Sequence, residues 1–201
     1  MVDGTDFLQY IDITDSLELS DYYKTDSHWR QENIIDVAEK LGNTMGADVK
    51  AEYDVKTLDV PFYGVYHGQI ALPLPSEELK ILTNSTLENC KVYDYQNGKE
   101  ISVYDMKKAN EKDPYEVFLS GPISLVTIEN ENAKTEKELV IFRDSFGSSI
   151  APLFAEGYKK ITLVDIRYIH PDMLGRYVEF NNQDVLFLYS ASVLNNSETL
   201  K

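Results

Sequence analysis

The last third of the chain alternates between short apolar runs and segments whose apolar residues recur at helical spacing. The runs cover 139–142, 160–166 and 184–190. The first run is unbroken, which is typical of a parallel strand that is covered on both faces. Helical spacing follows the first two runs, in Ile150, Leu153 and Phe154 and then in Met173, Leu174, Tyr177 and Val178. This order of strand, helix, strand, helix, strand predicts right-handed crossovers in a doubly wound α/β sheet.

The first half of the chain predicts one further helix and a strand. Apolar residues fall on one helical face at Ile34, Ile35, Val37, Ala38 and Leu41. An amphipathic helix that ends at Gly42 is therefore expected. Closer to the N-terminus, the apolar residues between Leu8 and Ile13 are strand-like.

Residues 51–137 have a different pattern, in which helical periodicity weakens and Tyr, Pro, Gly and Asn become frequent. Alternating runs at 91–95 and 100–104 flank the pair Asn97-Gly98, which is a strong hairpin signal. We interpret this region as a β-rich insertion within a single domain that spans 1–201.

The turn after the first buried run contains the most chemically suggestive serine. Ser145 follows the strand directly and precedes the expected helix. At such a turn a serine side chain projects beyond the carboxyl edge of the sheet, where backbone N–H groups can stabilise an oxyanion. A turn of this composition is also common as ordinary loop chemistry, so Ser145 alone does not identify an enzyme.

A possible base for this serine lies far upstream. Asp26 and His28 are two residues apart, and in an extended segment both side chains lie on one side of the backbone. A nucleophilic serine needs a histidine, and the histidine needs a carboxylate. We expect one ring nitrogen of His28 to approach Ser145 and the other to face Asp26, with Asp144 as the competing carboxylate. The alternative is a helix-entry loop in which Asp26 caps and His28 is solvated.

Together these blocks resemble a known family. The segment Tyr-Tyr-Lys-Thr-Asp-Ser-His-Trp at 22–29 and the segment Val-Ile-Phe-Arg-Asp-Ser-Phe-Gly-Ser-Ser at 140–149 are similar to the DHHW family of bacterial proteins. That family is similar to the SGNH-hydrolase-like domains of alginate O-acetylation proteins. The resemblance implies an SGNH-hydrolase-like three-layer sandwich with a central parallel sheet in permuted order. It also implies a Ser-His-Asp triad at Ser145, His28 and Asp26. Ser27 replaces the first histidine of the family motif.

Four other residues are candidates for substrate binding. Tyr63, Tyr66 and His67 lie in an aromatic, glycine-containing stretch, and aromatic faces stack well on sugar rings. They could equally form a tyrosine-rich strand packed on the core. Arg167 follows the second buried run at the same sheet edge, where it could bind a carboxylate or sugar hydroxyl, or pair with a nearby aspartate for structural reasons.

Composition and charge narrow the class of partner. The chain has 201 residues, 43% of them hydrophobic, so it is long and apolar enough for a folded domain. A net charge of −15 argues against nucleic acid and anionic membranes as partners. Neutral glycans or esters fit better, although the acidity could serve solubility alone.

The cysteine content and hydropathy of the sequence indicate no disulfide, metal site, membrane span or secretion signal within it. Cys90 is the only cysteine, so no intramolecular disulfide forms, and no Cys/His cluster has metal-ligand spacing. We expect neither a metal nor a cofactor. The sequence has no apolar run of about 20 residues and no basic-then-apolar leader, which a membrane span or a secretion signal would need. The resemblance implies an extracytoplasmic or cell-surface protein whose signal or anchor lies outside this sequence.

The resemblance implies carbohydrate ester chemistry, and we expect either an acetyl esterase or an O-acetyltransferase that acts on a cell-surface glycan. The alternative is a non-catalytic cell-envelope module that keeps the fold and binds a polysaccharide or a protein partner.

Overall fold

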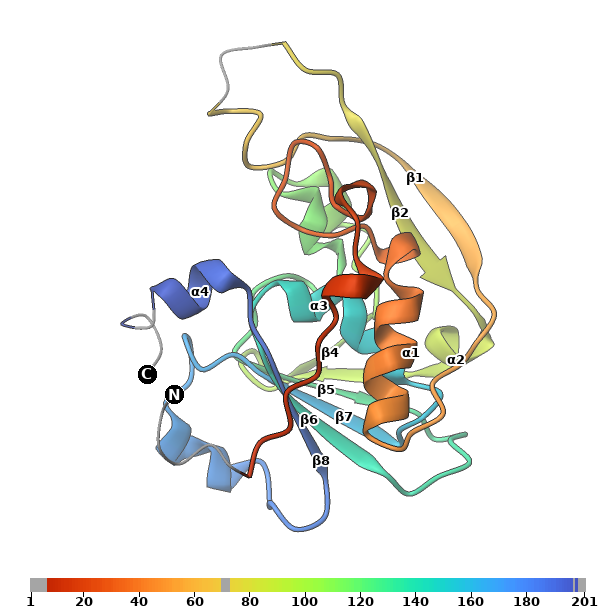
Figure 1. Ribbon diagram of the computed structural model, residues 1–201, viewed down its shortest axis with the longest axis vertical. Helices are drawn as coiled ribbons and strands as arrows, with labels where there is room; N and C mark the ends of the chain where they lie inside the picture. Colours follow the sequence, from red (N-terminus) through yellow and green to blue (C-terminus); the bar gives the residue numbers. More distant parts are fainter. Residues whose placement is uncertain (1–6, 70–72, 197, 199–201) are drawn as a thin grey trace.

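A computed structural model describes residues 7–69, 73–196 and 198 of the chain (Figure 1). A six-stranded sheet lies at its centre, with strand order β4-β3-β5-β7-β6-β8. The strands are β3 (Lys91–Asp94), β4 (Lys99–Ile101), β5 (Leu125–Glu129), β6 (Glu138–Arg143), β7 (Lys160–Val164) and β8 (Asp184–Leu188). The three apolar runs of the last third therefore form β6, β7 and β8, as the sequence predicts.

The sheet is mixed, which corrects the expectation of a parallel one. β6 pairs in parallel with β7 and β8, whereas β5 joins β7 antiparallel, and β3 joins β5 and β4 antiparallel. The hairpin at Asn97-Gly98 is confirmed, and Gly98 has the positive φ of 63° that such a turn requires. Alternation along β3 and β4 predicts strands, but it does not say that they extend the main sheet.

Alternate residues of β6 face two different layers. Leu139 and Ile141 pack into the larger core beneath α1 (Ile35–Thr44), while Val140 packs with Leu174 on the opposite face. Figure 1 shows α1 and α3 (Phe146–Ile150) in front of the sheet. Both faces are therefore covered around β6, as its unbroken apolar run indicates.

The helices are shorter and more irregular than predicted. α3 passes at once into the 3-10 helix η6 (Ala151–Phe154), which contains Pro152, and the segment after Pro171 is the 3-10 helix η7 (Pro171–Arg176). α1 runs past Gly42, and the left-handed residue that follows it is Gly46 with φ 69°. Residues 8–13 form no strand.

A second, two-stranded antiparallel sheet stands apart from the first. β1 (Asp54–Phe62) pairs with β2 (Glu77–Thr83), and their apolar side chains form a separate core with the segments around η4 (Lys108–Asn110) and η5 (Pro114–Val117). The proposed insertion at 51–137 therefore needs correction: only this first part is separate, since β3, β4 and β5 belong to the central sheet. The remaining helices are η1 (Thr14–Ser16), η2 (Leu19–Asp21), η3 (Gln31–Asn33), α2 (Ser85–Asn89) and α4 (Ala191–Asn195). Within the described ranges, no helix combines the length and apolar character needed to cross a membrane.

Candidate active site

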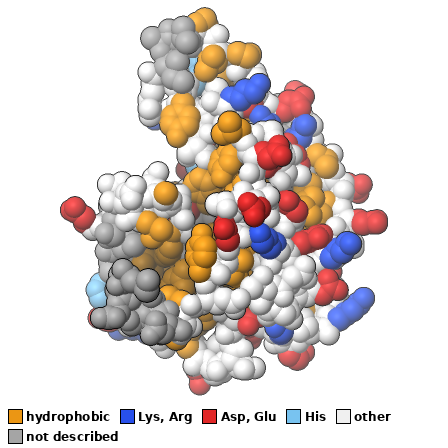
Figure 2. Space-filling view, viewed as in Figure 1, with side chains coloured by type: hydrophobic (Ala, Val, Ile, Leu, Met, Phe, Trp, Pro, Cys, Tyr) orange, Lys and Arg blue, Asp and Glu red, His pale blue; other side chains and the backbone are white. Residues whose placement is uncertain are grey.

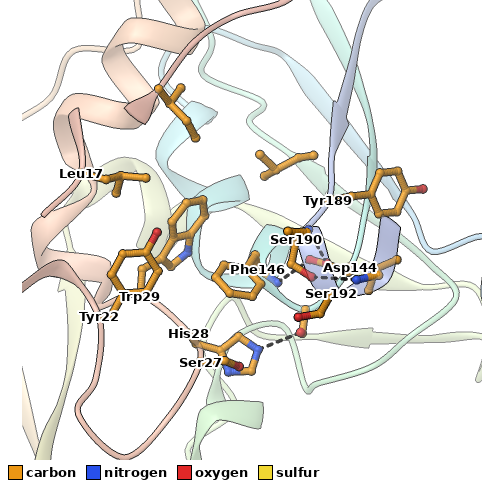
Figure 3. Close-up of a pocket in the computed structure, with 15 residues that line it drawn as sticks. Leu17, Tyr22, Ser27, His28, Trp29, Asp144, Phe146, Tyr189, Ser190 and Ser192 are labelled. Carbon is orange, nitrogen blue, oxygen red and sulfur yellow. Dashed lines mark hydrogen bonds between the residues drawn. The ribbon is translucent and has the colours of Figure 1, made fainter. Parts of the chain in front are cut away.

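Asp26, His28 and Ser145 form one continuous series of hydrogen bonds. Nε2 of His28 lies 2.7 Å from Oγ of Ser145, and Nδ1 of His28 lies 2.5 Å from Oδ1 of Asp26. The histidine and the serine are 117 positions apart in the sequence. The dashed line in Figure 3 marks the bond between them. The structure therefore brings together the three residues that the sequence selected.

The turn after β6 sets the position of Ser145. Ser145 has helical backbone angles at the start of α3, and Gly147 N–H donates to the carbonyl of Asp144. The Asp144 carboxylate accepts from Phe146 N–H at 3.0 Å and from Ser190 N–H at 2.7 Å. Both of its oxygens are therefore engaged by the backbone, and it is Asp26 rather than Asp144 that lies behind His28.

Arg143 supports this turn from inside the protein. Its side chain is fully buried, donating from Nη1 to the Asp144 carbonyl and the Ser148 hydroxyl, and from Nη2 to the Ile123 carbonyl. Burial lowers the pKa of Arg143, while the carboxylate of Asp165, 3.9 Å away, opposes that shift. Arg143, the last residue of β6, thus ties the Ser145 turn to the carbonyl of Ile123 and the carboxylate of Asp165.

The loop after β1 holds the Asp26 carboxylate. Oδ2 of Asp26 accepts from Val65 N–H at 2.9 Å, and Oδ1 also accepts from the backbone N–H of His28. Burial alone would raise the pKa of Asp26, but the hydrogen bonds from His28 and Val65 outweigh it and lower the pKa below its ordinary value. Asp26 is therefore ionised at neutral pH.

Glu77, at the start of β2, fixes the backbone just before Asp26. Its carboxylate accepts from the N–H groups of Lys24 and Thr25, from the Thr25 hydroxyl at 2.7 Å, and from Arg30 Nη2 at 2.5 Å. Although burial opposes ionisation, these bonds lower the pKa of Glu77. The small β1–β2 sheet thus holds the loop that carries Asp26 and His28.

Aromatic rings enclose the imidazole of His28. The ring of Tyr115 stacks on it at a centroid distance of 4.1 Å and an angle of 17°, and Phe146 lies 5.0 Å away. The hydroxyl of Tyr115 donates to Oγ of Ser149, which also accepts from Trp29 Nε1. No spacing signal pointed to Tyr115, since its role depends on the folding of η5 against α3.

A cavity of about 520 Å³ opens beside Ser145 and His28 (Figure 3). Figure 3 shows Leu17, Tyr22 and Trp29 on one side and the 189–192 segment on the other, with Phe146 between them. The described side chains around it are mostly apolar, with hydroxyls from Ser27, Ser190 and Ser192.

The four predicted substrate-binding residues lie outside this cavity. Arg167 makes a two-pronged ion pair with Asp165, at 2.9 Å from Nε and 2.7 Å from Nη2, which is the structural pairing that the sequence left open. Tyr63, Tyr66 and His67 lie on the loop that binds Asp26; Tyr63 and Tyr66 are exposed, and Tyr63 and His67 contact each other.

The described part of the chain offers no group of three or more His, Cys, Asp or Glu side chains that could hold a metal ion.

Searches against protein-family models and against curated proteins find no match. Among solved structures, a DHHW family protein from Eubacterium siraeum superposes with a TM-score of 0.71 at 23% identity, covering 90% of this chain and 63% of that one. PatB1 of Bacillus cereus, solved with a sulfonyl adduct, gives a TM-score of 0.67 at 24% identity, covering 87% and 62%. A second structure of Bacillus cereus PatB1 gives a TM-score of 0.66 at 23% identity, covering 87% of this chain and 64% of that one.

At these identities the likeness concerns the fold. The chain has the mixed α/β fold shared by a DHHW family protein and PatB1, which agrees with the family that the sequence resembles. It spans less than two thirds of the length of each of these proteins.

Proposed function

We propose that the protein carries out ester chemistry on a carbohydrate, with Ser145 as nucleophile, His28 as base and Asp26 as the carboxylate that orients His28. The observation that carries this proposal is the hydrogen-bonded series from Asp26 to Ser145, assembled from two distant segments beside a cavity. A serine becomes nucleophilic when a histidine accepts its proton, and a buried carboxylate stabilises the resulting imidazolium.

The reaction balances with these three groups alone. Oγ of Ser145 bonds to the acyl carbon of the ester, the carbon–alkoxy bond breaks, and the serine proton passes through Nε2 of His28 to the departing alcohol. In the second step, water or a sugar hydroxyl attacks the acyl-serine, gives its proton to His28, and restores the serine hydroxyl. Water makes the protein an esterase, and a sugar hydroxyl makes it an O-acyltransferase.

The backbone N–H of Ser145 is available to the oxyanion that forms in each step. Among the described residues none accepts a hydrogen bond from it, whereas the N–H groups of Phe146 and Gly147 are engaged by Asp144. A free donor at the nucleophile is what an oxyanion requires.

The carbohydrate part of the proposal is supported by the exposed aromatic loop. Tyr63 and Tyr66 are 46% and 40% exposed, and the loop that carries them donates to Asp26 through Val65 N–H. A sugar ring stacked there would lie on the Asp26 side of the site. The similarity to SGNH-like domains of alginate O-acetylation proteins, with the Asp-x-His element early and the serine late, favours a cell-surface glycan and an extracytoplasmic location.

The same exposed tyrosines favour the second candidate, a non-catalytic module that binds a polysaccharide or a cell-envelope protein. The two candidates differ in their need for Ser145. A binding module would keep its affinity for glycan when Ser145 is replaced and would hydrolyse no ester.

Hydrolysis of a small acetyl ester, such as 4-nitrophenyl acetate or an acetylated xylose, tests the proposal. We expect turnover by the native chain and none above background by Ser145→Ala with an unchanged melting temperature. Equal rates for the two proteins would overturn it. Added oligosaccharide that diverts the acyl group from water to sugar would identify a transferase.

A further inference from the structure

The cavity beside Ser145 is apolar over most of its wall. Its aliphatic and aromatic lining comes from three separate parts of the chain: the N-terminal segment, the start of α3, and the end of β8 with the segment that follows it. These side chains are Ile13, Leu17, Tyr22, Trp29, Phe146, Leu188, Tyr189, Ala191 and Val193. The space-filling view in Figure 2 is notched beside α4, and hydrophobic side chains gather in that notch.

The cavity also offers no free charge to a ligand. Asp144 is the one acidic residue among the described residues that line it, and no Lys or Arg does so. Both oxygens of Asp144 already accept backbone hydrogen bonds, from Phe146 and Ser190. Beyond His28, the polar lining is limited to hydroxyls and backbone, so the cavity favours a neutral ligand.

We propose that this cavity binds the acyl chain of the substrate, and that the chain is uncharged and longer than acetyl. The inference rests on the proposed function, because Oγ of Ser145 must reach the acyl carbon while the chain attached to that carbon extends into the cavity. A volume of about 520 Å³ falls in the range of pockets that hold whole small molecules. An acetyl group has three non-hydrogen atoms and would leave most of this apolar surface uncovered.

A sugar ring fits this lining poorly. Each sugar hydroxyl that leaves water needs a hydrogen-bond partner, and the cavity supplies few, mainly the hydroxyls of Ser27, Ser190 and Ser192. The exposed Tyr63 and Tyr66 lie outside it, on the loop that binds Asp26. The two ends of the ester are thus divided between two surfaces, with the acyl chain in the cavity and the alcohol towards the tyrosine loop.

The dependence of ester hydrolysis on acyl-chain length tests whether the cavity binds the acyl chain. For 4-nitrophenyl acetate, butanoate and octanoate, kcat/KM should rise with chain length, by about fourfold for each methylene that the cavity buries. Butanoate, with two more methylenes than acetate, should exceed it by about sixteenfold. Hydrolysis of acetate with equal or lower values for butanoate and octanoate would overturn the acyl cavity and leave the proposed function standing.

A matched pair of variants on α4 assigns the effect to the cavity. Ser192 lines the cavity and is exposed, whereas Asn195 is exposed on the same helix and does not line it. Ser192→Trp should fill the space and bring the octanoate-to-acetate ratio close to one, while Asn195→Trp should preserve the native ratio. A ratio unchanged by Ser192→Trp would contradict the assignment.

A binding measurement separates this inference from the proposed function. In the Ser145→Ala background, octanamide should raise the melting temperature and acetamide should not, because a ligand that binds only the folded state stabilises it. The shift should vanish when Ser192→Trp is added. Absence of any shift with octanamide overturns the cavity whatever the enzyme activity. Absence of all ester hydrolysis by the native chain overturns the proposed function instead.

Discussion

The turn that carries Ser145 and the loop that carries His28 hold their side chains by different means. The turn is organised mostly by its immediate neighbours, because Phe146 N–H donates to Asp144 Oδ1 and Gly147 N–H donates to the Asp144 carbonyl. The loop is organised by residues far away in the sequence: Val65 is 39 positions from Asp26, and Glu77 is 52 positions from Thr25.

The two regions therefore differ in which substitutions can disturb them. A turn that is held by local hydrogen bonds depends mainly on its own residues. The loop is held by Val65 and Glu77 of the β1–β2 region, so changes there should affect activity without touching Ser145 or the imidazole of His28.

The largest effect on ester hydrolysis is expected from Ser145 and His28, where the turn and the loop meet. Ser145→Ala and His28→Ala should each lower kcat/KM for a small acetyl ester by roughly a thousandfold or more. The double variant should be about as poor as either single one, because the pair acts as a unit. Steady-state kinetics with melting curves as a folding control tests this. Losses that multiply would show two independent contributions.

The two aspartates should behave differently. Asp26→Asn removes the charge that stabilises the imidazolium and should lower kcat by roughly a thousandfold. Asp144→Asn replaces an acceptor oxygen with an amide donor that faces a backbone N–H, and should cost about 1–3 kcal/mol of unfolding free energy. Its effect on kcat should be smaller than that of Asp26→Asn. Larger kinetic damage from Asp144→Asn would reverse the roles assigned to the two residues.

The pH dependence of stability tests whether the charge of Asp26 stabilises the folded protein. Its pKa is lower in the folded protein than its ordinary value of 3.8, so its ionised form contributes stability above that pH. The contribution is lost as the pH falls through the folded pKa. In urea titrations, the native chain should exceed Asp26→Asn in stability at pH 7, and this excess should shrink below about pH 4. A constant excess would mean that the charge of Asp26 is not what stabilises the loop.

Much of the Ser145 turn could be predicted from the sequence, whereas the surroundings of His28 could not. Hydrophobic runs identify β6, β7 and β8, and Asn97-Gly98 identifies its hairpin, because these signals act between near neighbours. The antiparallel placement of β3 and β5 depends on pairing between distant segments. The hydrophobic pattern of one segment does not specify its register with another. Tyr115 and Glu77 likewise reach the site only through the packing of η5 and β2.

A smaller effect is expected from a pair of glycines after β1. A Cβ at Gly64 would lie 2.3 Å from both Asp26 Cβ and the Thr25 carbonyl, whereas one at Gly68 would meet nothing within 4 Å. Gly64→Ala should therefore displace the Asp26 loop and lower kcat by about a hundredfold. Gly68→Ala is the matched control and should have the activity of the native chain. Equal activity in both variants would show that the loop tolerates displacement.

The smallest effect concerns metals. Neither the turn nor the loop uses a metal in this account, so EDTA should change neither the melting temperature nor ester hydrolysis. Thermal unfolding and kinetic assays before and after chelation test this. A fall of several degrees would show that a metal holds one of the two regions in place.

The central claim is that the distant Asp26–His28 loop activates Ser145. Covalent labelling tests it most directly, since sulfonyl fluorides react with activated nucleophiles: the serine oxygen bonds to sulfur and fluoride leaves. Incubation with phenylmethanesulfonyl fluoride and mapping by peptide mass spectrometry should place one adduct on Ser145, absent from the urea-unfolded chain and strongly reduced in His28→Ala. A folded native chain that stays unlabelled, or an adduct on Ser145 that forms equally fast without His28, would contradict the claim.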